Sequence, residues 1–332
     1  MTTESVTNPS RILAVIVNFN GGEDVLRAID SLLRQTHPIA RIIVVDNASV
    51  DGSTTRIAER FPHVELLVQR ENLGFAAANN LAVGTDDTSD WVFLLNPDAW
   101  AEPDCLQTML RTAERDKAID MVSCRLLNAN DLTRLDGTGD SYHVSGLSWR
   151  RDHGGHANIK RGTGENVFSP CGAASLYRTS KWQQAGGFDE RYFCYNEDVD
   201  LAFRLRLTGS QCVHVDEAVV HHIGSAVTGR ESDFSIYHGH RNLVWTFFKN
   251  MPRRLMLRYL PQHIVLTIAT LIYYTAKGRG RVIFTAKWHA IRSLPIIWRS
   301  RRQSEKQNPA VNSIDDHMVK GWLTPYFGRN RH

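Results

Sequence analysis

The chain has 332 residues, of which 42% are hydrophobic and 22% are charged, and its formal net charge is +4. This composition is typical of a folded globular protein with one large core or two smaller ones, and it argues against a disordered chain. The five cysteines are scattered and form no CxxC pair, so we expect reduced packing residues instead of disulfides or a zinc site.

The charge is unevenly distributed. Thirteen Lys and Arg and no Asp or Glu lie between Arg241 and Ser304, whereas residues 1–240 hold 22 Lys and Arg against 32 Asp and Glu. An acidic body with a basic appendage suggests two tasks in one chain. Residues 1–10 are polar and lack the apolar core of a secretory signal, so we expect a flexible N-terminus and a cytoplasmic protein.

Strand and helix patterns alternate over the first hundred residues. Apolar runs at 12–17, 42–45, 64–68 and 91–95 predict buried strands, and the segments between them predict helices at 25–33, 54–60 and 73–83. The alternation predicts an α/β fold with a mainly parallel sheet and helices on both faces.

Polar residues follow three of these strands, namely Asn18 and Asn20, Asp46 and Asn47, and Asn96 and Asp98. The carboxyl ends of parallel strands meet at one edge of a sheet, where open α/β sheets bind ligands. The Gly-rich stretch 121–177 predicts loops and short strands.

A helix is predicted over 197–207, directly after a turn and an aromatic cluster. Its first turn holds three carboxylates, Glu197, Asp198 and Asp200. The helix dipole explains one of them well, but a carboxylate against aromatic walls is also the environment of a general base. Asp200 and Arg204 have the i,i+4 spacing of an ion pair. A Val-rich strand at 213–220 then leads to His221 and His222.

The basic segment 241–304 contains a thirteen-residue apolar stretch, 264–276, flanked by arginines and interspersed with Trp and Tyr. We expect it to be too short to span a bilayer, which needs roughly 20 residues. The pattern favours amphipathic helices in the interface of an anionic membrane over an ordinary helical cap on the core. Nucleic-acid binding is disfavoured, because the apolar runs would have no use there.

Together these motifs resemble the nucleotide-sugar transferases of glycosyltransferase family 2, which have the GT-A fold, and among them the bacterial rhamnosyltransferase-like enzymes. The resemblance rests on six motifs in order, at 17–20, 45–53, 71–80, 95–99, 186–201 and 221–225. It implies a GT-A catalytic domain at 11–240, with a nucleotide-binding half at 11–120 and an acceptor-side half at 121–240. The basic helical segment at 241–304 and a tail at 305–332 follow.

The resemblance implies that Asp46 accepts the ring N–H of a pyrimidine base, with turn capping as the alternative. Asn18 and Asn20 would help frame the base and ribose. Asn72 and Gly74 open the third helix, where backbone N–H groups favour an anion, and Asn80 lies further along it. For these three residues the alternative is helix capping.

The segment Asn96-Pro97-Asp98 occupies the place of the family's metal-binding Asp-x-Asp motif. Asp98 would coordinate Mg²⁺ or Mn²⁺ that bridges the donor diphosphate. Asn96 replaces the first aspartate and leaves fewer anionic ligands. The family's histidine ligand corresponds to His222, with His221 in reserve.

The resemblance implies that Asp198 is the base of an inverting single displacement. Glu197 and Asp200 are expected to orient the acceptor or brace the helix, and Gly172 and Arg241 join them on the acceptor side. The Gln-x-x-Arg-Trp motif of processive members is absent, so a non-processive enzyme is expected.

The first choice of donor is dTDP-rhamnose, with UDP-galactofuranose, UDP-GlcNAc, UDP-glucose and GDP-mannose as alternatives. The resemblance implies a lipid-linked or cell-surface glycan as the acceptor, and the enzyme is expected to be peripheral on the inner face of the cell membrane. A non-catalytic nucleotide-binding protein is a weaker alternative. A dinucleotide-dependent oxidoreductase is excluded because no GxGxxG follows the first strand.

Overall fold

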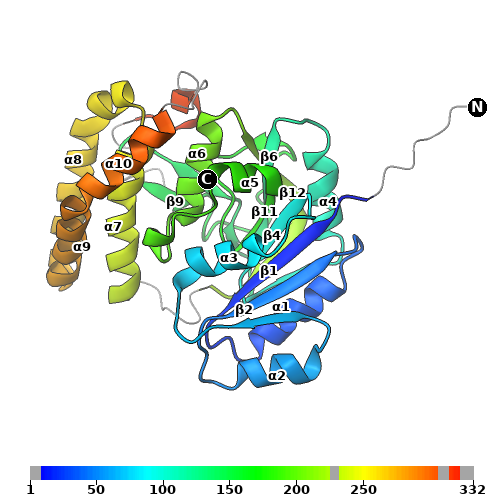
Figure 1. Cartoon of the computed structure of the whole chain (residues 1–332). Coiled ribbons are helices and arrows are strands. Elements are labelled where there is room, and N and C mark those ends of the chain that lie inside the picture. The colour runs from blue at the N-terminus through cyan, green and yellow to red at the C-terminus, as the bar shows by residue number, and fades with distance from the viewer. Residues whose placement is uncertain (1–8, 225–231, 306–313, 322–332) are drawn as a thin grey trace, which may run out of the picture.

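The computed structural model describes residues 9–224, 232–305 and 314–321. Its N-terminal half is a parallel sheet in the order β4-β1-β2-β3 (Figure 1). The strands are β1 (Ile12–Asn18), β2 (Arg41–Asp46), β3 (Glu65–Val68) and β4 (Trp91–Leu95), and the helices between them are α1 (Asp24–Leu33), α2 (Ser53–Arg60) and α3 (Gly74–Gly84). The predicted strands and helices are therefore confirmed to within one or two residues.

Alternate residues of β1 pack on opposite faces of the sheet. Ile12, Ala14 and Ile16 join the core formed with α1 and α2, whereas Leu13 and Val15 join the core formed with α3. All seven residues of β1 are buried, as expected for a strand that is covered on both sides.

The parallel arrangement expected for the first hundred residues is confirmed, and beyond β4 the sheet is mixed. Strand β11 (Ala174–Arg178) runs antiparallel to β4 and to β6 (Ile119–Asn128), and β12 (Gln211–His222) runs parallel to β6. Shorter strands flank them: β5 (Ala99–Ala101), β7 (Leu135–Gly137) and β10 (Glu165–Asn166), with a separate hairpin of β8 (Asp140–Tyr142) and β9 (Ser148–Arg150). The helical elements here are α4 (Cys105–Ala113), α5 (Thr179–Ala185), the 3-10 turn η1 (Glu190–Tyr192) and α6 (Glu197–Leu207).

The C-terminal helices form a bundle along one side of the molecule (Figure 1). They are α7 (Asp233–Asn250), α8 (Arg253–Ala276), α9 (Gly280–Arg292) and α10 (Leu294–Glu305), followed by the 3-10 turn η2 (Ile314–His317). Helix α7 packs on α6 and also contacts α9 and α10, so it connects the outer helices to α6. It runs without interruption across residue 240, where the sequence analysis divides the domains.

Helix α8 corrects one expectation. The apolar stretch 264–276 belongs to a helix of 24 residues, and α8 is long and apolar enough to cross a membrane by length and composition alone. The statement that this segment is too short to span a bilayer is therefore wrong. The helix continues through Pro261 towards its N-terminus, which an apolar run alone does not indicate.

All five cysteines are free, and four of them are buried. This confirms the expectation of reduced packing residues.

Candidate active site

The loops after β1 and β2 are joined by buried hydrogen bonds. Asn18 is fully buried, and its Nδ2 lies 2.7 Å from Asp46 Oδ1, 2.9 Å from Ser53 Oγ and 3.1 Å from Ser49 Oγ. The other Asp46 oxygen accepts a hydrogen bond from the Ser49 backbone N–H at 3.1 Å. Asp46 thus caps the turn, as the alternative interpretation held, and its contact with a base stays a prediction.

Asn20 also forms hydrogen bonds between the same two loops. Its backbone N–H donates to Ser49 Oγ at 2.9 Å, and its Oδ1 accepts from the Val50 N–H at 2.8 Å. The residue has a φ of 54°, a left-handed conformation that asparagine tolerates better than most residues. Asn20 therefore shapes this edge of the sheet.

Two of the first N–H groups of α3, those of Gly74 and Ala76, already have protein partners. Gly74 N–H donates to Asn72 Oδ1 at 2.9 Å, and Ala76 N–H donates to the Phe193 carbonyl at 3.1 Å. Asn72 thus caps the start of the helix, and its contact with an anion stays a prediction. Asn80 uses its side chain differently, because it both donates to and accepts from the Phe188 backbone, at 2.8 and 2.9 Å, and so holds the turn before η1.

The segment after β4 meets the end of β12. His222 Nε2 lies 3.3 Å from Asp98 Oδ1 and 3.4 Å from Asn96 Nδ2. The backbone secures this approach, since Ile223 N–H donates to the Asp98 carbonyl at 3.0 Å and Gly224 N–H to Asp98 Oδ2 at 3.2 Å. The structure therefore brings Asn96, Asp98 and His222 together. Ser225, the last residue of this motif, lies outside the described residues.

His221 faces the other side of β12. Its Nε2 lies 2.6 Å from Glu102 Oε1, and its ring stacks on Trp100 with the centroids 5.2 Å apart. Successive side chains of a strand point to opposite faces, so only one of the two histidines can reach Asp98. That residue is His222.

Asp136 of β7 orients His222 and was missed by the sequence analysis. His222 Nδ1 lies 2.7 Å from Asp136 Oδ2, and Asp136 also pairs with Arg150. Burial acts to lower the pKa of His222, but its hydrogen bonds to Asp136 and Asp98 outweigh burial and raise this pKa above its ordinary value. Burial likewise acts to raise the pKa of Asp98, but His222 holds it below its ordinary value.

This group fits a divalent cation by the chemistry of its donors. Asp98 Oδ1 lies 3.3 Å from His222 Nε2, and a carboxylate oxygen is a ligand that Mg²⁺ and Mn²⁺ accept. The amide of Asn96 lies beside them, with its Nδ2 3.4 Å from His222 Nε2. The Asp136 carboxylate accepts a hydrogen bond from Nδ1–H of His222, so Nε2 is directed at Asp98. The carboxylate partner of a metal-bound histidine has the same role.

Asp198 lies at the start of α6, where backbone N–H groups hold both of its oxygens. Oδ2 accepts from the Gly172 N–H and Oδ1 from the Val199 N–H, each at 2.8 Å. A Cβ atom on Gly172 would lie 3.2 Å from Asp198 Oδ2, so the absence of a side chain there permits this close approach. Gly172 is therefore the residue that positions Asp198.

The two parts of the site meet at the segment before β11. Ala173 accepts a hydrogen bond from the Asn96 N–H at 2.9 Å, and its neighbour Gly172 binds Asp198. The Asp98 loop and the start of α6 are thus attached to adjacent residues.

The loop that leads into α6 has unusual backbone geometry. Phe193, Tyr195 and Asn196 have φ values of 66°, 68° and 65°. Such conformations are costly for residues with a side chain and persist where the surrounding structure holds them.

Helix α7 supplies that support. Asn242 is fully buried, and its Nδ2 lies 2.7–3.0 Å from the carbonyl oxygens of Tyr192, Cys194 and Tyr195. Arg241, predicted on the acceptor side, donates to the Tyr192 carbonyl at 2.9 Å. Both residues therefore shape the loop before the expected base, and Asn242 was missed because its partners lie about fifty residues away in sequence.

Asp200 braces α6. It is fully buried, and its carboxylate binds Lys249 Nζ at 2.9 Å, Arg204 Nε at 2.9 Å and Asn250 Nδ2 at 2.8 Å. Burial acts to raise the pKa of Asp200, but Lys249 and Arg204 outweigh it and keep this pKa below its ordinary value. The predicted pair with Arg204 is confirmed, and Lys249 and Asn250 of α7 are added to it.

Glu197 differs from Asp198 and Asp200 in its hydrogen bonding. Its Oε2 is buried and has no hydrogen-bond partner among the residues that the structure describes. Burial raises the pKa of Glu197 well above its ordinary value, and the nearby Asp198 adds to the effect. The three carboxylates of the first turn thus have three distinct environments.

Comparison with known proteins places this geometry in context. The family model described as Glycosyl transferase family 2 matches residues 13–184. The chain is 30% identical over 238 residues to the N-acetylglucosaminyl-diphospho-decaprenol L-rhamnosyltransferase of Mycobacterium tuberculosis, covering 65% of this chain and 77% of the relative. It is 28% identical over 226 residues to the galactofuranosyltransferase GlfT1 of the same organism, covering 64% and 71%.

Two solved structures share the fold at low identity. One is GalNAc-T7 with UDP, GalNAc and Mn²⁺, with a TM-score of 0.62 and 14% identity, covering 77% of this chain and 50% of that one. The other is the mannosyltransferase PcManGT from Pyrobaculum calidifontis in complex with GDP-Man and Mn²⁺, with a TM-score of 0.53 and 18% identity, covering 93% and 87%. At these identities the likeness shows the GT-A fold.

Proposed function

From its membership of glycosyl transferase family 2, as a glycosyltransferase of the rhamnosyltransferase type, we propose a reaction for this chain. It moves L-rhamnose from dTDP-rhamnose to a lipid-linked acceptor. The observation that carries the proposal is the convergence of two groups on the segment before β11. One group, Asp98 with His222, suits a donor diphosphate and its cation, and the other is the backbone-held carboxylate of Asp198.

Asp198 acts as the base in this proposal. Its carboxylate takes the proton of the acceptor hydroxyl while that oxygen forms a bond to the anomeric carbon. The bond from the anomeric carbon to the diphosphate oxygen breaks on the opposite face, and the nucleoside diphosphate leaves with the electron pair. A single displacement of this kind inverts the anomeric configuration.

The donor is oriented by the sheet edge. Asp98 and His222, with Asn96 beside them, would hold Mg²⁺ or Mn²⁺, which when bound neutralises charge on the diphosphate. Asp46 and Asn20 line the turns where the base and ribose are expected. Both structural neighbours cited above carry Mn²⁺ with a nucleotide or nucleotide sugar, which supports a divalent cation at this position.

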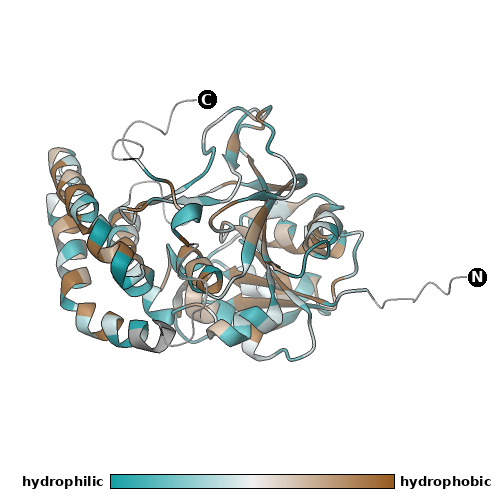
Figure 2. Ribbon diagram, turned by 90° about the horizontal axis from the view of Figure 1, so that it is seen from above, coloured by the Kyte–Doolittle hydropathy of each residue, from teal (hydrophilic) through white to brown (hydrophobic). Residues whose placement is uncertain are grey.

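A lipid-linked acceptor is supported by the relative whose name includes diphospho-decaprenol. The outer helices support the same substrate class. Large apolar side chains on α8–α10 are 38–65% exposed, including Leu257, Ile268, Ile272, Phe284 and Trp288, and an open, largely apolar groove of about 790 Å³ lies between α8 and α9. Hydrophobic and hydrophilic residues alternate along these helices in Figure 2.

Positive charge surrounds this apolar surface. Residues 253–304 contain no Asp or Glu, and Arg253, Arg254, Arg258, Arg281 and Arg292 are exposed. Exposed apolar side chains among cations match a bilayer with anionic lipids, which attracts the charge and buries the apolar groups. We therefore propose that the enzyme lies on the inner face of the cell membrane, with α8–α10 against the lipid.

The test is a donor panel. Purified full-length protein is incubated with Mn²⁺, an N-acetylglucosaminyl-diphospho-polyprenol and one of dTDP-rhamnose, UDP-galactofuranose, UDP-GlcNAc, UDP-glucose or GDP-mannose. The mass gained by the acceptor distinguishes a deoxyhexose from a hexose and from an N-acetylhexosamine. A deoxyhexose gained only from dTDP-rhamnose supports the proposal. A hexose from UDP-galactofuranose would instead assign the second candidate, which the similarity to GlfT1 favours.

A further inference from the structure

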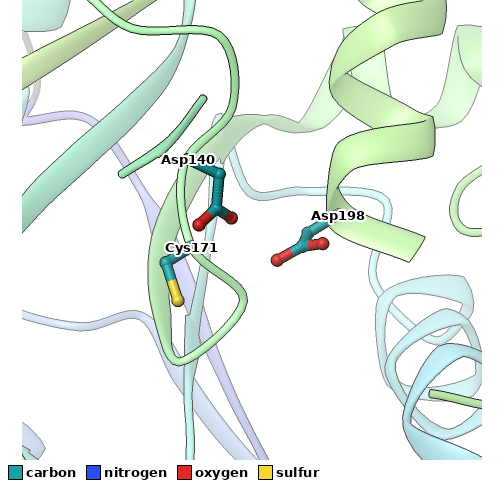
Figure 3. A group of neighbouring side chains, drawn as sticks. All are labelled: Asp140, Cys171 and Asp198. Atoms are coloured by element: carbon teal, nitrogen blue, oxygen red, sulfur yellow. The ribbon is translucent and has the colours of Figure 1, made fainter. Parts of the chain in front are cut away.

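A second carboxylate faces Asp198 at the start of α6. The side chains of Asp140 and Asp198 point towards each other in Figure 3, with Cys171 beside them. A carboxylate oxygen of each aspartate and the Cys171 sulfur all lie within 4.8 Å of one another. Asp140 belongs to the Gly-rich stretch that the sequence analysis interpreted only as loops and short strands.

The backbone holds Asp140 in this place. Its N–H donates to the Ser169 carbonyl at 2.8 Å, and it pairs with Arg150 in the β8–β9 hairpin. Asp140 is 8% exposed, and no described donor forms a hydrogen bond with its carboxylate. Its partner Asp198, by contrast, accepts two backbone hydrogen bonds, each at 2.8 Å.

This difference decides where a proton resides. Burial raises the pKa of Asp140 well above its ordinary value, and the negative charge of Asp198 raises it further. Burial raises the pKa of Asp198 as well, but the N–H groups of Gly172 and Val199 oppose this by stabilising the ionised form. Two close carboxylates in a buried site titrate as a pair, so the less stabilised member keeps the proton.

The other titratable groups around the pair do not change this assignment. Arg150 is the nearby cation. It forms an ion pair with Asp136, and its charge acts to lower the pKa of both Asp140 and Asp198, so it does not favour one of them by sign. Glu197 is buried with a raised pKa and adds no cation, and burial raises the pKa of the Cys171 thiol well above its ordinary value. A neutral thiol is a poor ligand for a hard cation, so the three side chains fit proton sharing better than a second metal site.

We propose that Asp140 is a positioning residue for the transfer reaction, because it retains a proton and so leaves Asp198 with the single negative charge of the pair. The inference rests on the proposed role of Asp198 as the base. A neutral Asp140 spares the reacting centre a second buried charge and keeps Asp198 ionised for the acceptor hydroxyl.

The test uses unfolding and requires no substrate. Asp140 keeps its proton in the folded protein after the unfolded chain has lost it, so folding takes up a proton. Wild-type stability therefore falls as pH rises from about 4, the ordinary pKa of aspartate, towards the raised pKa of the folded pair. The variant Asp140→Asn lacks this group, so its melting temperature relative to wild type should rise by several degrees between pH 4.5 and pH 7.5.

The variant Asp216→Asn is the matched control, because Asp216 is equally buried but pairs with Arg125 and has a lowered pKa. Its melting temperature relative to wild type should stay nearly constant over the same pH range, because a group with a lowered pKa changes stability only below about pH 4. If Asp140→Asn does not fold, Asp198→Asn serves instead, since removal of the Asp198 charge also reduces the pH dependence. A constant difference between Asp140→Asn and wild type at all pH values overturns the inference.

Kinetics separate this inference from the proposed function. Absence of sugar transfer by wild type would overturn the function without altering the unfolding result. If transfer occurs, kcat should fall further in Asp140→Ala than in Asp140→Asn, because the amide reproduces a neutral carboxyl group. Equal losses in both variants would count against the role of the retained proton.

Discussion

At the scale of single residues, substitutions of Asp136, His221 and His222 distinguish side chains that serve metal binding from side chains that serve only the fold. His222→Ala and Asp136→Asn should each weaken the binding of dTDP in the presence of Mn²⁺, by about 10–100-fold for the orienting residue Asp136. Neither should affect binding in the absence of metal. Isothermal titration with and without Mn²⁺ measures this directly.

His221→Ala is the control for this experiment. It removes the neighbouring imidazole, which stacks on Trp100 and binds Glu102 on the other side of β12. Metal-dependent binding should remain near the wild-type value. Equal losses in His221→Ala and His222→Ala, or losses that do not depend on metal, would show that these side chains serve only the fold.

The packing of α3 against the loop before α6 gives a prediction at the scale of an element. Gly74 has a φ of +83°, and a Cβ atom there would lie 2.6 Å from the Phe193 ring and 2.7 Å from its carbonyl oxygen. Gly74→Ala should therefore destabilise the protein by about 1–3 kcal/mol in urea unfolding. It should also lower kcat, because Phe193 belongs to the loop that leads to Asp198.

Gly84 ends the same helix and offers a matched control. It has no positive φ, and nothing lies within 4 Å of the position that a Cβ atom would take. Gly84→Ala should leave stability unchanged or raise it by up to about 1 kcal/mol. Similar losses of stability in the two variants would mean that the close approach of Gly74 to Phe193 does not determine the effect of Gly74→Ala.

Elements differ in how far the sequence predicts them. The strands and helices of residues 12–95 follow from local apolar periodicity, and the choice of His222 over His221 follows from the resemblance of residues 222–225 to the family's histidine motif. Asp136 and Asp140 could not be placed in this way, because β7 and β8 are only three residues long and their positions depend on pairing with distant segments. Asn242 and Lys249 were hidden for the same reason, since they bind residues about fifty positions earlier.

At the scale of the whole molecule, we predict that the protein binds membranes that contain anionic lipid. Full-length protein should float with vesicles that contain anionic lipid at low salt, and binding should weaken as salt rises, because salt screens the attraction of the exposed cations. Some binding should persist at high salt, since burial of apolar side chains is not screened. Protein that remains unbound to anionic vesicles at low salt would remove the membrane proposal.

Two substitutions distinguish the apolar contribution to membrane binding from the electrostatic one. Ile268→Glu places a charge on the exposed face of α8 and should reduce the binding that remains at high salt, whereas Arg254→Gln should reduce only the salt-sensitive part. The exposed Leu132→Glu, which lies far from α8 in sequence, is the control and should bind vesicles as wild type does. Retention of salt-resistant binding by Ile268→Glu would argue against docking through α8.

The most direct test of the central claim is the anomeric configuration of the product, measured by NMR for wild type and Asp198→Asn. With dTDP-rhamnose and the diphospho-polyprenol acceptor, wild type should give a rhamnoside whose configuration is inverted relative to the donor. Asp198→Asn should lose about 10²–10⁴-fold in kcat, the usual contribution of a general base, while it remains folded and keeps its affinity for dTDP. A product of retained configuration, or an Asp198→Asn variant with turnover near that of wild type, would contradict single displacement with Asp198 as the base.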